Sequence, residues 1–351
     1  MIRLRSIAAL SFAALLASGY ATSEGITDAS LSKRIPLPEG ASEELKKSIE
    51  SRPPISISQA IQHEIPKDTN DLIKLINKRN KFRAARDIKT LEQSSVSIRR
   101  ETLEGVSVNW LMPSSINPNH RNHLFIHLHG GAYLMGAGDA GIQEGIIIAE
   151  KLGIAVVSID YRMPPLHPFP AAVDDVVATY RALLKKHSNQ SIAMGGTSAG
   201  GGLTLAATLR FKQLDLPLPG ALYAGTPWAD LSETGDSYFI NEGIDRVLVT
   251  YKGILAGAAR LYANGRDLKD PLLSPVYGDF SGFPPTYLVT GTRDLFLSAT
   301  ALTHRKLRRA GALADLNVYE GVSHADYLLQ DLPESGEVFE ELNKFVSKHL
   351  R

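Results

Sequence analysis

The sequence predicts an α/β protein with a mostly parallel central sheet flanked by helices, and a helical cap in addition. Short apolar runs alternate with helical patterns from residue 106 to residue 319, which is typical of parallel strands covered on both faces. The 351 residues, 44% of them hydrophobic and 21% charged, have an ordinary globular composition and are enough for a large core. Glycines and polar side chains follow several of the apolar runs, and they suggest chemistry at strand ends.

The strand predictions rest on these apolar runs. Val106–Trp110 alternates as a half-exposed strand should, and short apolar runs typical of buried strands follow until Ala314–Tyr319 closes the series. The later strands are expected at Leu124–Leu128, Ile154–Ile159, Ile192–Met194, Ala221–Ala224, Tyr287–Val289 and Ala314–Tyr319.

Two long helical patterns suit crossovers between these strands: Ala171–Leu184 and the residues after Gly202. The stretch between the strands near Ala224 and Tyr287 is longer than a crossover needs. Because it includes a helix-like pattern at Val247–Ala263, we expect a cap insertion at about residues 231–268.

The N-terminus differs in composition from the rest of the chain. Arg3 and Arg5 precede an apolar run, and small residues follow up to Ala21, so residues 1–21 are expected to be a signal peptide. The protein would then be exported, either periplasmic or secreted. The run is too short for a stable membrane span, which takes about 20 apolar residues.

Residues 22–100 are expected to form an N-terminal cap segment, and residues 101–351 the catalytic domain. Prolines restrict the first part of this segment to short helices, and Asp68 then begins a longer one. On that helix, Leu72 and Phe82 belong to an apolar face, whereas Lys74, Lys78 and Arg79 are expected to face solvent.

Composition excludes several classes of function. The chain has no cysteine, so thiol nucleophiles, disulfides and cysteine-ligated metals are excluded. Its 38 Lys+Arg and 37 Asp+Glu leave a formal net charge of +1, which gives no electrostatic indication of nucleic-acid binding.

The strongest motif is Gly196-Thr197-Ser198-Ala199-Gly200, which matches G-x-S-x-G. This motif needs a sharp turn from a strand into a helix, so that the serine hydroxyl is exposed above the sheet. An apolar strand precedes the motif here and a helical pattern follows it. Ser198 is therefore the candidate nucleophile.

A second motif, His127-Leu128-His129-Gly130-Gly131, directly follows the Leu124 strand. Glycines at a strand end leave backbone N–H groups free to bind a developing oxyanion. We expect the amides of Gly130, Gly131 and Ala199 to form the oxyanion hole. His127 and His129 lack a third ligand and are not expected to bind a metal.

The acid and base are sought at later strand ends. In α/β-hydrolases the chain order is serine, acid, histidine, and Asp294 and His324 satisfy it. Asp270 is a rival acid, but it precedes the strand that should carry the acid. Asp326 is too close to His324 in sequence to turn round and orient the ring.

These motifs resemble the bacterial hormone-sensitive-lipase family of α/β-hydrolases. The resemblance includes the segment 160–172 (DYRMPPLHPFPAA), covers roughly residues 106–350, and implies an eight-stranded sheet with a helical cap. The chain departs from the family pattern at four positions. Thr197 stands where Asp is common, Leu166 where Glu is frequent, Ser298 where a second Asp often follows the acid, and Ala132 at the third glycine of the oxyanion loop.

Two other functions compete with this one. Gly136–Gly141 matches G-x-G-x-x-G, with Asp160 placed to bind a ribose, so a dinucleotide-binding oxidoreductase is an alternative. It requires the first glycine directly after the strand, but His129–Met135 intervenes. A non-catalytic binding protein with a hydrolase fold is the other alternative.

The sequence therefore predicts a serine carboxylic-ester hydrolase that uses neither metal nor cofactor. The resemblance implies short-to-medium acyl esters or small lactones as small-molecule substrates, cleaved through an acyl-enzyme. Tyr133, Trp228 and Phe239 are candidates to line the pocket.

Overall fold

The structure is a computed structural model that describes residues 35–62, 65–329 and 331–351. Residues Leu37–Arg351 form one compact unit. The expected signal peptide, residues 1–21, lies outside the described residues. No helix in the described ranges has the length and apolar character that a membrane span requires.

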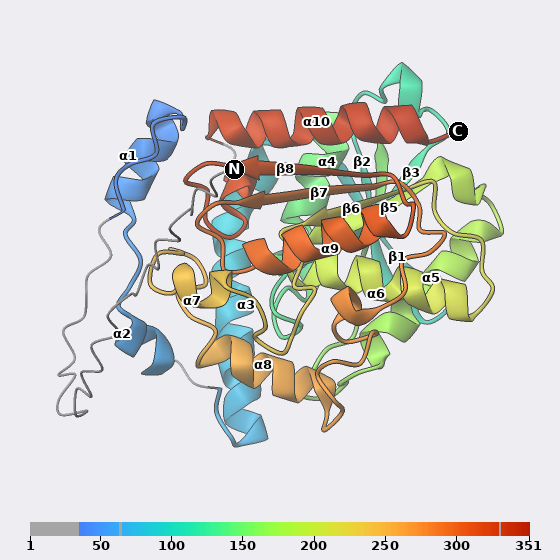
Figure 1. The fold of residues 1–351 in the computed structure, drawn as a ribbon. Coiled ribbons are helices and arrows are strands. Elements are labelled where there is room, and N and C mark those ends of the chain that lie inside the picture. Colours follow the sequence, from blue (N-terminus) through green and yellow to red (C-terminus); the bar gives the residue numbers. More distant parts are fainter. Residues whose placement is uncertain (1–34, 63–64, 330) are drawn as a thin grey trace, which may run out of the picture. The chain divides into compact units, whose positions relative to one another are not determined.

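An eight-stranded sheet organises this unit, in the order β1-β2-β4-β3-β5-β6-β7-β8 (Figure 1). The strand β2 pairs antiparallel with β1 and β4, and the other neighbours pair in parallel. The strands are β1 Ser97–Leu103, β2 Val106–Met112, β3 Leu124–Leu128, β4 Ala155–Ile159, β5 Ile192–Thr197, β6 Ala221–Gly225, β7 Thr286–Gly291 and β8 Ala314–Tyr319.

Helices cover both faces of the sheet (Figure 1). One buried apolar cluster lies between the sheet and helices α4 and α10, and the other joins the opposite face to α5, α6 and α9. The helices are α1 Glu43–Ser51, α2 Ile57–Gln62, α3 Thr69–Gln93, α4 Gln143–Leu152, α5 Ala171–Leu184, α6 Ala199–Gln213, α7 Ser237–Ile240, α8 Ile254–Ala263, α9 Leu297–Arg309 and α10 Pro333–His349.

The topology determines where polar loops meet. Because β3, β5, β6, β7 and β8 are parallel neighbours, their carboxyl ends lie along one edge of the sheet. The register pairs His127 of β3 with Gly195 of β5, which brings the segment after β3 beside the turn after β5. All the loops that carry the candidate site leave from this edge.

Two elements differ from the expectation. The strand β1 was not predicted, because this edge strand is mostly exposed and has no apolar run. It also crosses the expected boundary between residues 100 and 101. The helix expected at Val247–Ala263 begins only at Ile254, because Val249 and Gly253 have positive φ angles of 62° and 84°, which a right-handed helix cannot accommodate.

The long helix α3 buries a different face from the one expected. Phe82 is 73% exposed, whereas Arg79 is half-buried and lines a pocket. Apolar spacing along α3 was too irregular to locate the buried face, and α3 packs beside the turn at Gly138–Gly141 and α4. Side chains of the N-terminal segment contact the insertion: a β carbon added to Gly257 of α8 would lie only 2.8 Å from Cδ1 of Ile65.

Candidate active site

Ser198 occupies a strained turn between β5 and α6. Its φ and ψ angles are 64° and −123°, which a residue with a side chain adopts only when its surroundings enforce them. Two backbone hydrogen bonds do so: Ser198 N–H donates to Gly225 O at 2.8 Å, and Trp228 N–H donates to Ser198 O at 2.9 Å. The end of β6 therefore holds the turn that exposes the hydroxyl.

The glycines on either side of Ser198 allow this turn to approach β3. A β carbon on Gly196 would lie 1.8 Å from the carbonyl oxygen of Leu128, and one on Gly200 would lie 1.9 Å from the same oxygen. No side chain fits in either place. The G-x-S-x-G spacing is thus a packing requirement between β3 and the serine turn.

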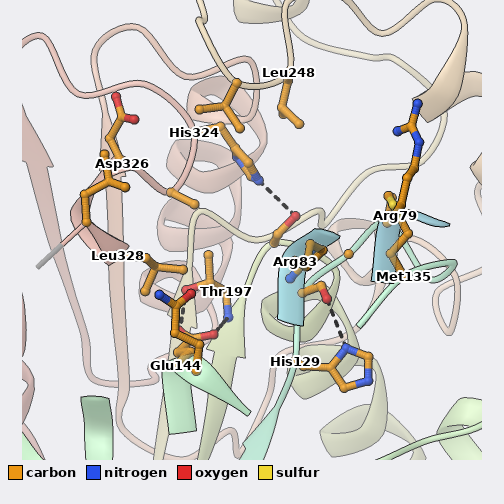
Figure 2. Close-up of a pocket in the computed structure, with 18 of the residues that line it drawn as sticks. Arg79, Arg83, His129, Met135, Glu144, Thr197, Leu248, His324, Asp326 and Leu328 are labelled. Carbon is orange, nitrogen blue, oxygen red and sulfur yellow. Dashed lines mark hydrogen bonds between the residues drawn. The ribbon is translucent and has the colours of Figure 1, made fainter. Parts of the chain in front are cut away.

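The structure brings Ser198, His324 and Asp294 together. Nε2 of His324 lies 2.9 Å from Oγ of Ser198, which is the dashed line drawn from His324 in Figure 2. Nδ1 of His324 lies 3.1 Å from Oδ1 of Asp294. Asp270, the rival acid, instead accepts a hydrogen bond from the amide of Leu272 in a separate turn.

Asp294 is fully buried and accepts several further hydrogen bonds. The hydroxyl of Thr290 donates to Oδ2 at 2.9 Å, the hydroxyl of Thr226 donates to the same oxygen, and the amide of Phe296 donates to Oδ1 at 2.8 Å. Thr226 also lies 3.0 Å from Nδ1 of His324. Thr226 belongs to no recognisable motif, and its position directly after β6 is the one feature of the sequence that could have indicated it.

The pKa of His324 reflects these neighbours. Burial acts to lower the pKa, but the charge and hydrogen bond of Asp294, with the charges of Asp245 and Asp326, outweigh burial and raise it. Asp245 is itself fully buried, and burial together with the charge of Asp294 raises its pKa to about 6. A histidine beside this much negative charge is a stronger base than a free imidazole.

Residues of the insertion hold both loops of the candidate triad. Asp245 accepts a hydrogen bond from the amide of Leu295, next to Asp294, at 3.0 Å. The side-chain Nδ2 of Asn241 donates to the carbonyl oxygen of Asp294 at 2.8 Å. The buried Arg246 pairs with Asp326 at 2.7 Å, two residues beyond His324. Motif reasoning missed these three residues, since none belongs to a strand end.

The segment after β3 provides free backbone donors beside the serine. Within the described residues, the amides of Gly130, Gly131 and Ala199 donate to no protein acceptor. A β carbon on Gly130 would lie 3.3 Å from Cβ of Ser198, so the loop is in contact with the nucleophile. Ala199 is the first residue of α6, where helical amides have no intrahelical partner.

Comparison with known proteins identifies the family. A model of the α/β-hydrolase fold family matches residues 125–328. The chain belongs to the α/β-hydrolase family. The crystal structure of an esterase E25 is 48% identical, superimposes with a TM-score of 0.88, and covers 91% of this chain and 98% of its own.

More distant relatives of this α/β-hydrolase are also ester hydrolases by name. A structure of an esterase from the bacterial hormone-sensitive lipase family is 28% identical with a TM-score of 0.73, covering 88% of this chain and 99% of its own. An acetyl-hydrolase of Streptomyces hygroscopicus is 30% identical over 70% of this chain and 81% of its own length. The α/β-hydrolase is thus a carboxylic ester hydrolase of the hormone-sensitive-lipase family, as the motifs predicted.

The dinucleotide alternative is not favoured for this α/β-hydrolase. Gly138–Gly141 forms a 3-10 turn after the oxyanion loop, and the amide of Gly138 donates to Oδ1 of Asp160 at 3.1 Å. Asp160 therefore binds the glycine turn itself.

The two histidines of the α/β-hydrolase's oxyanion motif have separate partners. Nδ1 of His127 lies 2.9 Å from Ser158 Oγ, and its Nε2 lies 3.3 Å from Glu144 Oε2. His129 stacks on Tyr161, and burial lowers its pKa to about 3, so the ring is neutral. Both side chains support the loop.

A carboxylate lies below the serine turn of the α/β-hydrolase, in place of the one common in the family. Thr197 donates to Glu144 twice, from Oγ1 to Oε1 at 2.5 Å and from its amide to Oε2 at 3.1 Å (Figure 2). Glu144 comes from α4. Thr197 stands where an aspartate is common in the family. In this chain the carboxylate at the serine turn comes instead from Glu144, which Thr197 binds.

The pocket of the α/β-hydrolase has a volume of about 690 Å³ and opens onto Ser198 and His324. Its wall comes from α3, the oxyanion loop, the insertion at residues 247–255 and the segment after His324. The three expected lining residues, Tyr133, Trp228 and Phe239, are absent from it. Tyr133 and Trp228 are buried, and their rings stack on each other. Phe239 is 60% exposed elsewhere on the insertion.

Proposed function

We propose that Ser198, His324 and Asp294 are the catalytic triad of this esterase. The observation that carries the proposal is the continuous chain of hydrogen-bond distances from Ser198 Oγ through His324 to Asp294. His324 takes the proton of Ser198 as the hydroxyl attacks the ester carbonyl. Asp294 holds the ring so that Nε2 faces the serine, and it stabilises the imidazolium that forms.

The amides of Gly130, Gly131 and Ala199 bind the oxygen that becomes negative in the tetrahedral intermediate. Each such donor contributes roughly 3–4 kcal/mol by precedent. The intermediate collapses as His324 gives its proton to the leaving alcohol, which leaves the acyl group on Ser198. Water then attacks the acyl-enzyme, with His324 again as the base, and the acid is released.

The pocket supports small substrates. A volume of about 690 Å³ lies within the range of small-molecule sites, roughly 300–1,000 Å³. We therefore assign short-to-medium acyl esters or small lactones as the substrate class.

A paired experiment tests the nucleophile. Ser198→Ala should abolish labelling by a fluorophosphonate probe and leave only the residual hydrolysis of p-nitrophenyl butyrate that the oxyanion hole and binding supply. Ser115→Ala, at an exposed serine, should change neither readout. Undiminished labelling of the Ser198→Ala variant would contradict the assignment.

We also propose that the protein is exported. The basic start, the apolar run and the small residues up to Ala21 support this assignment. N-terminal sequencing of the protein from the periplasm or medium should begin after residue 21. A mature protein that retains residues 1–21 in the cytoplasm would refute it.

A further inference from the structure

Helix α3 places positive charge inside the active-site pocket. Arg79 and Arg83 both line it, and they are one helical turn apart, so they lie on the same face of α3. The neighbouring Lys78 and Lys81 are exposed and lie outside the pocket. Hydrolysis of a neutral ester needs no cation at this position.

The charge of Arg79 has no carboxylate partner among the described residues. Its guanidinium is half-buried, and this burial lowers its pKa. Burying a charge without a counter-charge costs free energy, so a ligand that supplied the counter-charge would be stabilised here.

Three acidic residues line the same pocket: Asp331 is exposed to solvent, and the other two are bound elsewhere. Glu144 accepts from Thr197, and Asp326 pairs with the buried Arg246. The cation Lys252 lies 3.7 Å from Glu242. Arg79 is therefore the half-buried charge of the pocket that can serve a ligand.

Arg83 adds positive potential close to the oxyanion loop. Burial lowers the pKa of His129 most, and the charge of Arg83 is one of the smaller causes that lower it further. The charge of Arg83 therefore reaches the loop that holds Gly130 and Gly131. Because His129 is neutral, the positive charge at this end of the pocket belongs to the arginines.

The direction of the reaction indicates which half of the substrate meets these arginines. The leaving alcohol must lie near Nε2 of His324, which protonates it. Figure 2 shows Arg79 on the side of the pocket opposite His324, with Arg83 between them in the view. The acyl half of the ester therefore extends toward α3.

We propose that this esterase accepts half-esters of short dicarboxylic acids, whose free carboxylate binds Arg79 while the ester carbonyl lies at Ser198. A guanidinium suits a carboxylate because it can donate two parallel hydrogen bonds. This inference rests on the proposed function and adds the chemical class of the acyl group.

The test compares two esters of equal acyl length. Ethyl hydrogen glutarate carries the carboxylate, ethyl valerate does not, and acid release from both is followed in a pH-stat at low ionic strength. The wild type should cleave the half-ester at least as efficiently as ethyl valerate. Arg79→Gln should lower kcat/KM about 10- to 100-fold for the half-ester, the value of a charged hydrogen bond, and change that for ethyl valerate little.

Two further variants and one further substrate complete the design. Lys78 is the neighbouring exposed cation, and Lys78→Gln should leave kcat/KM unchanged for both substrates. Arg79→Lys should keep part of the activity on the half-ester relative to ethyl valerate. Equal losses on both substrates in Arg79→Gln would show a structural role and overturn the proposal. So would a tenfold preference of the wild type for ethyl valerate. The substrate 3-acetoxypropionate carries its carboxylate on the alcohol side. If Arg79→Gln lowers kcat/KM for this ester and not for the half-ester, the proposal is also overturned.

Failure of the proposed function is distinguishable from failure of this inference. If the catalytic assignment is wrong, Ser198→Ala retains turnover of p-nitrophenyl butyrate. If only the inference is wrong, p-nitrophenyl butyrate and ethyl valerate are cleaved through Ser198, and the half-ester is rejected.

Discussion

The buried pair of Glu144 and Thr197 below the serine turn makes a quantitative prediction. The carboxylate of Glu144 accepts two hydrogen bonds from Thr197 and lies 3.3 Å from a nitrogen of His127. Glu144→Gln keeps the shape but replaces one acceptor oxygen by a donor, so a buried donor loses its partner. The cost is about 1–3 kcal/mol, which corresponds to a fall in Tm of roughly 2–6 °C.

The same substitution should slow catalysis, since the amide of Thr197 lies next to Ser198. A displacement of the nucleophile by about 1 Å can cost about 100-fold in rate. We expect kcat/KM for p-nitrophenyl butyrate to fall about 10- to 100-fold on the same principle. Glu150→Gln, at an exposed position of α4, is the matched control and should match the wild type.

A double-mutant cycle decides whether the two residues act as a pair. Thr197→Asp alone places a second carboxylate against Glu144, and the repulsion should destabilise the protein more than Glu144→Gln does. Combining the two leaves a single carboxylate and should recover part of the loss. If the two changes in unfolding free energy, measured by urea denaturation, add within about 0.5 kcal/mol, the reasoning is refuted.

Three further predictions concern the triad and its packing. Asp294→Asn should lower kcat about 10⁴-fold by the serine-protease precedent, whereas Asp270→Asn should remain near wild type; the reverse result in steady-state assays would make Asp270 the acid. Asp245→Asn removes a buried negative charge that raises the pKa of His324. Because activity is lost as pH falls through that pKa, the acid limb of the kcat/KM profile should move to lower pH, and an unmoved limb would mean that this charge does not act on the base. Gly200→Ala forces a β carbon to 1.9 Å from a strand carbonyl oxygen, so urea denaturation should show severe destabilisation, and wild-type stability would contradict the packing argument.

The parts of the fold that sequence could predict are those with strong local signals. The five runs from Leu124–Leu128 to Tyr287–Val289 are almost entirely buried, and each of them forms a strand. The run Ala314–Tyr319 also forms a strand, although it is partly exposed. The edge strand β1 has charged, exposed residues and pairs only with β2, so its formation depends on a partner strand and not on its own pattern. The start of α8 likewise depends on a positive φ at Val249, which no propensity favours.

The candidate site divides in the same way. Ser198 and the glycines around it are specified by a local turn, and chain order was enough to prefer Asp294 over Asp270. Thr226 and Asp245 could not be found, because their roles come from contacts across about 50 to 100 residues of sequence. Arg79 was expected on a solvated face, and only the position of α3 beside the oxyanion loop places it in the pocket.

The insertion between β6 and β7 has a consequence for chimeric enzymes. Its residues 247–255 form part of the pocket wall, while Asn241, Asp245 and Arg246 bind the loops of Asp294 and His324. An exchange of the whole insertion with that of a relative would therefore alter the strength of the base together with the choice of substrate. Variants that separate the two properties should exchange only the wall residues, and leave the three supporting side chains in place.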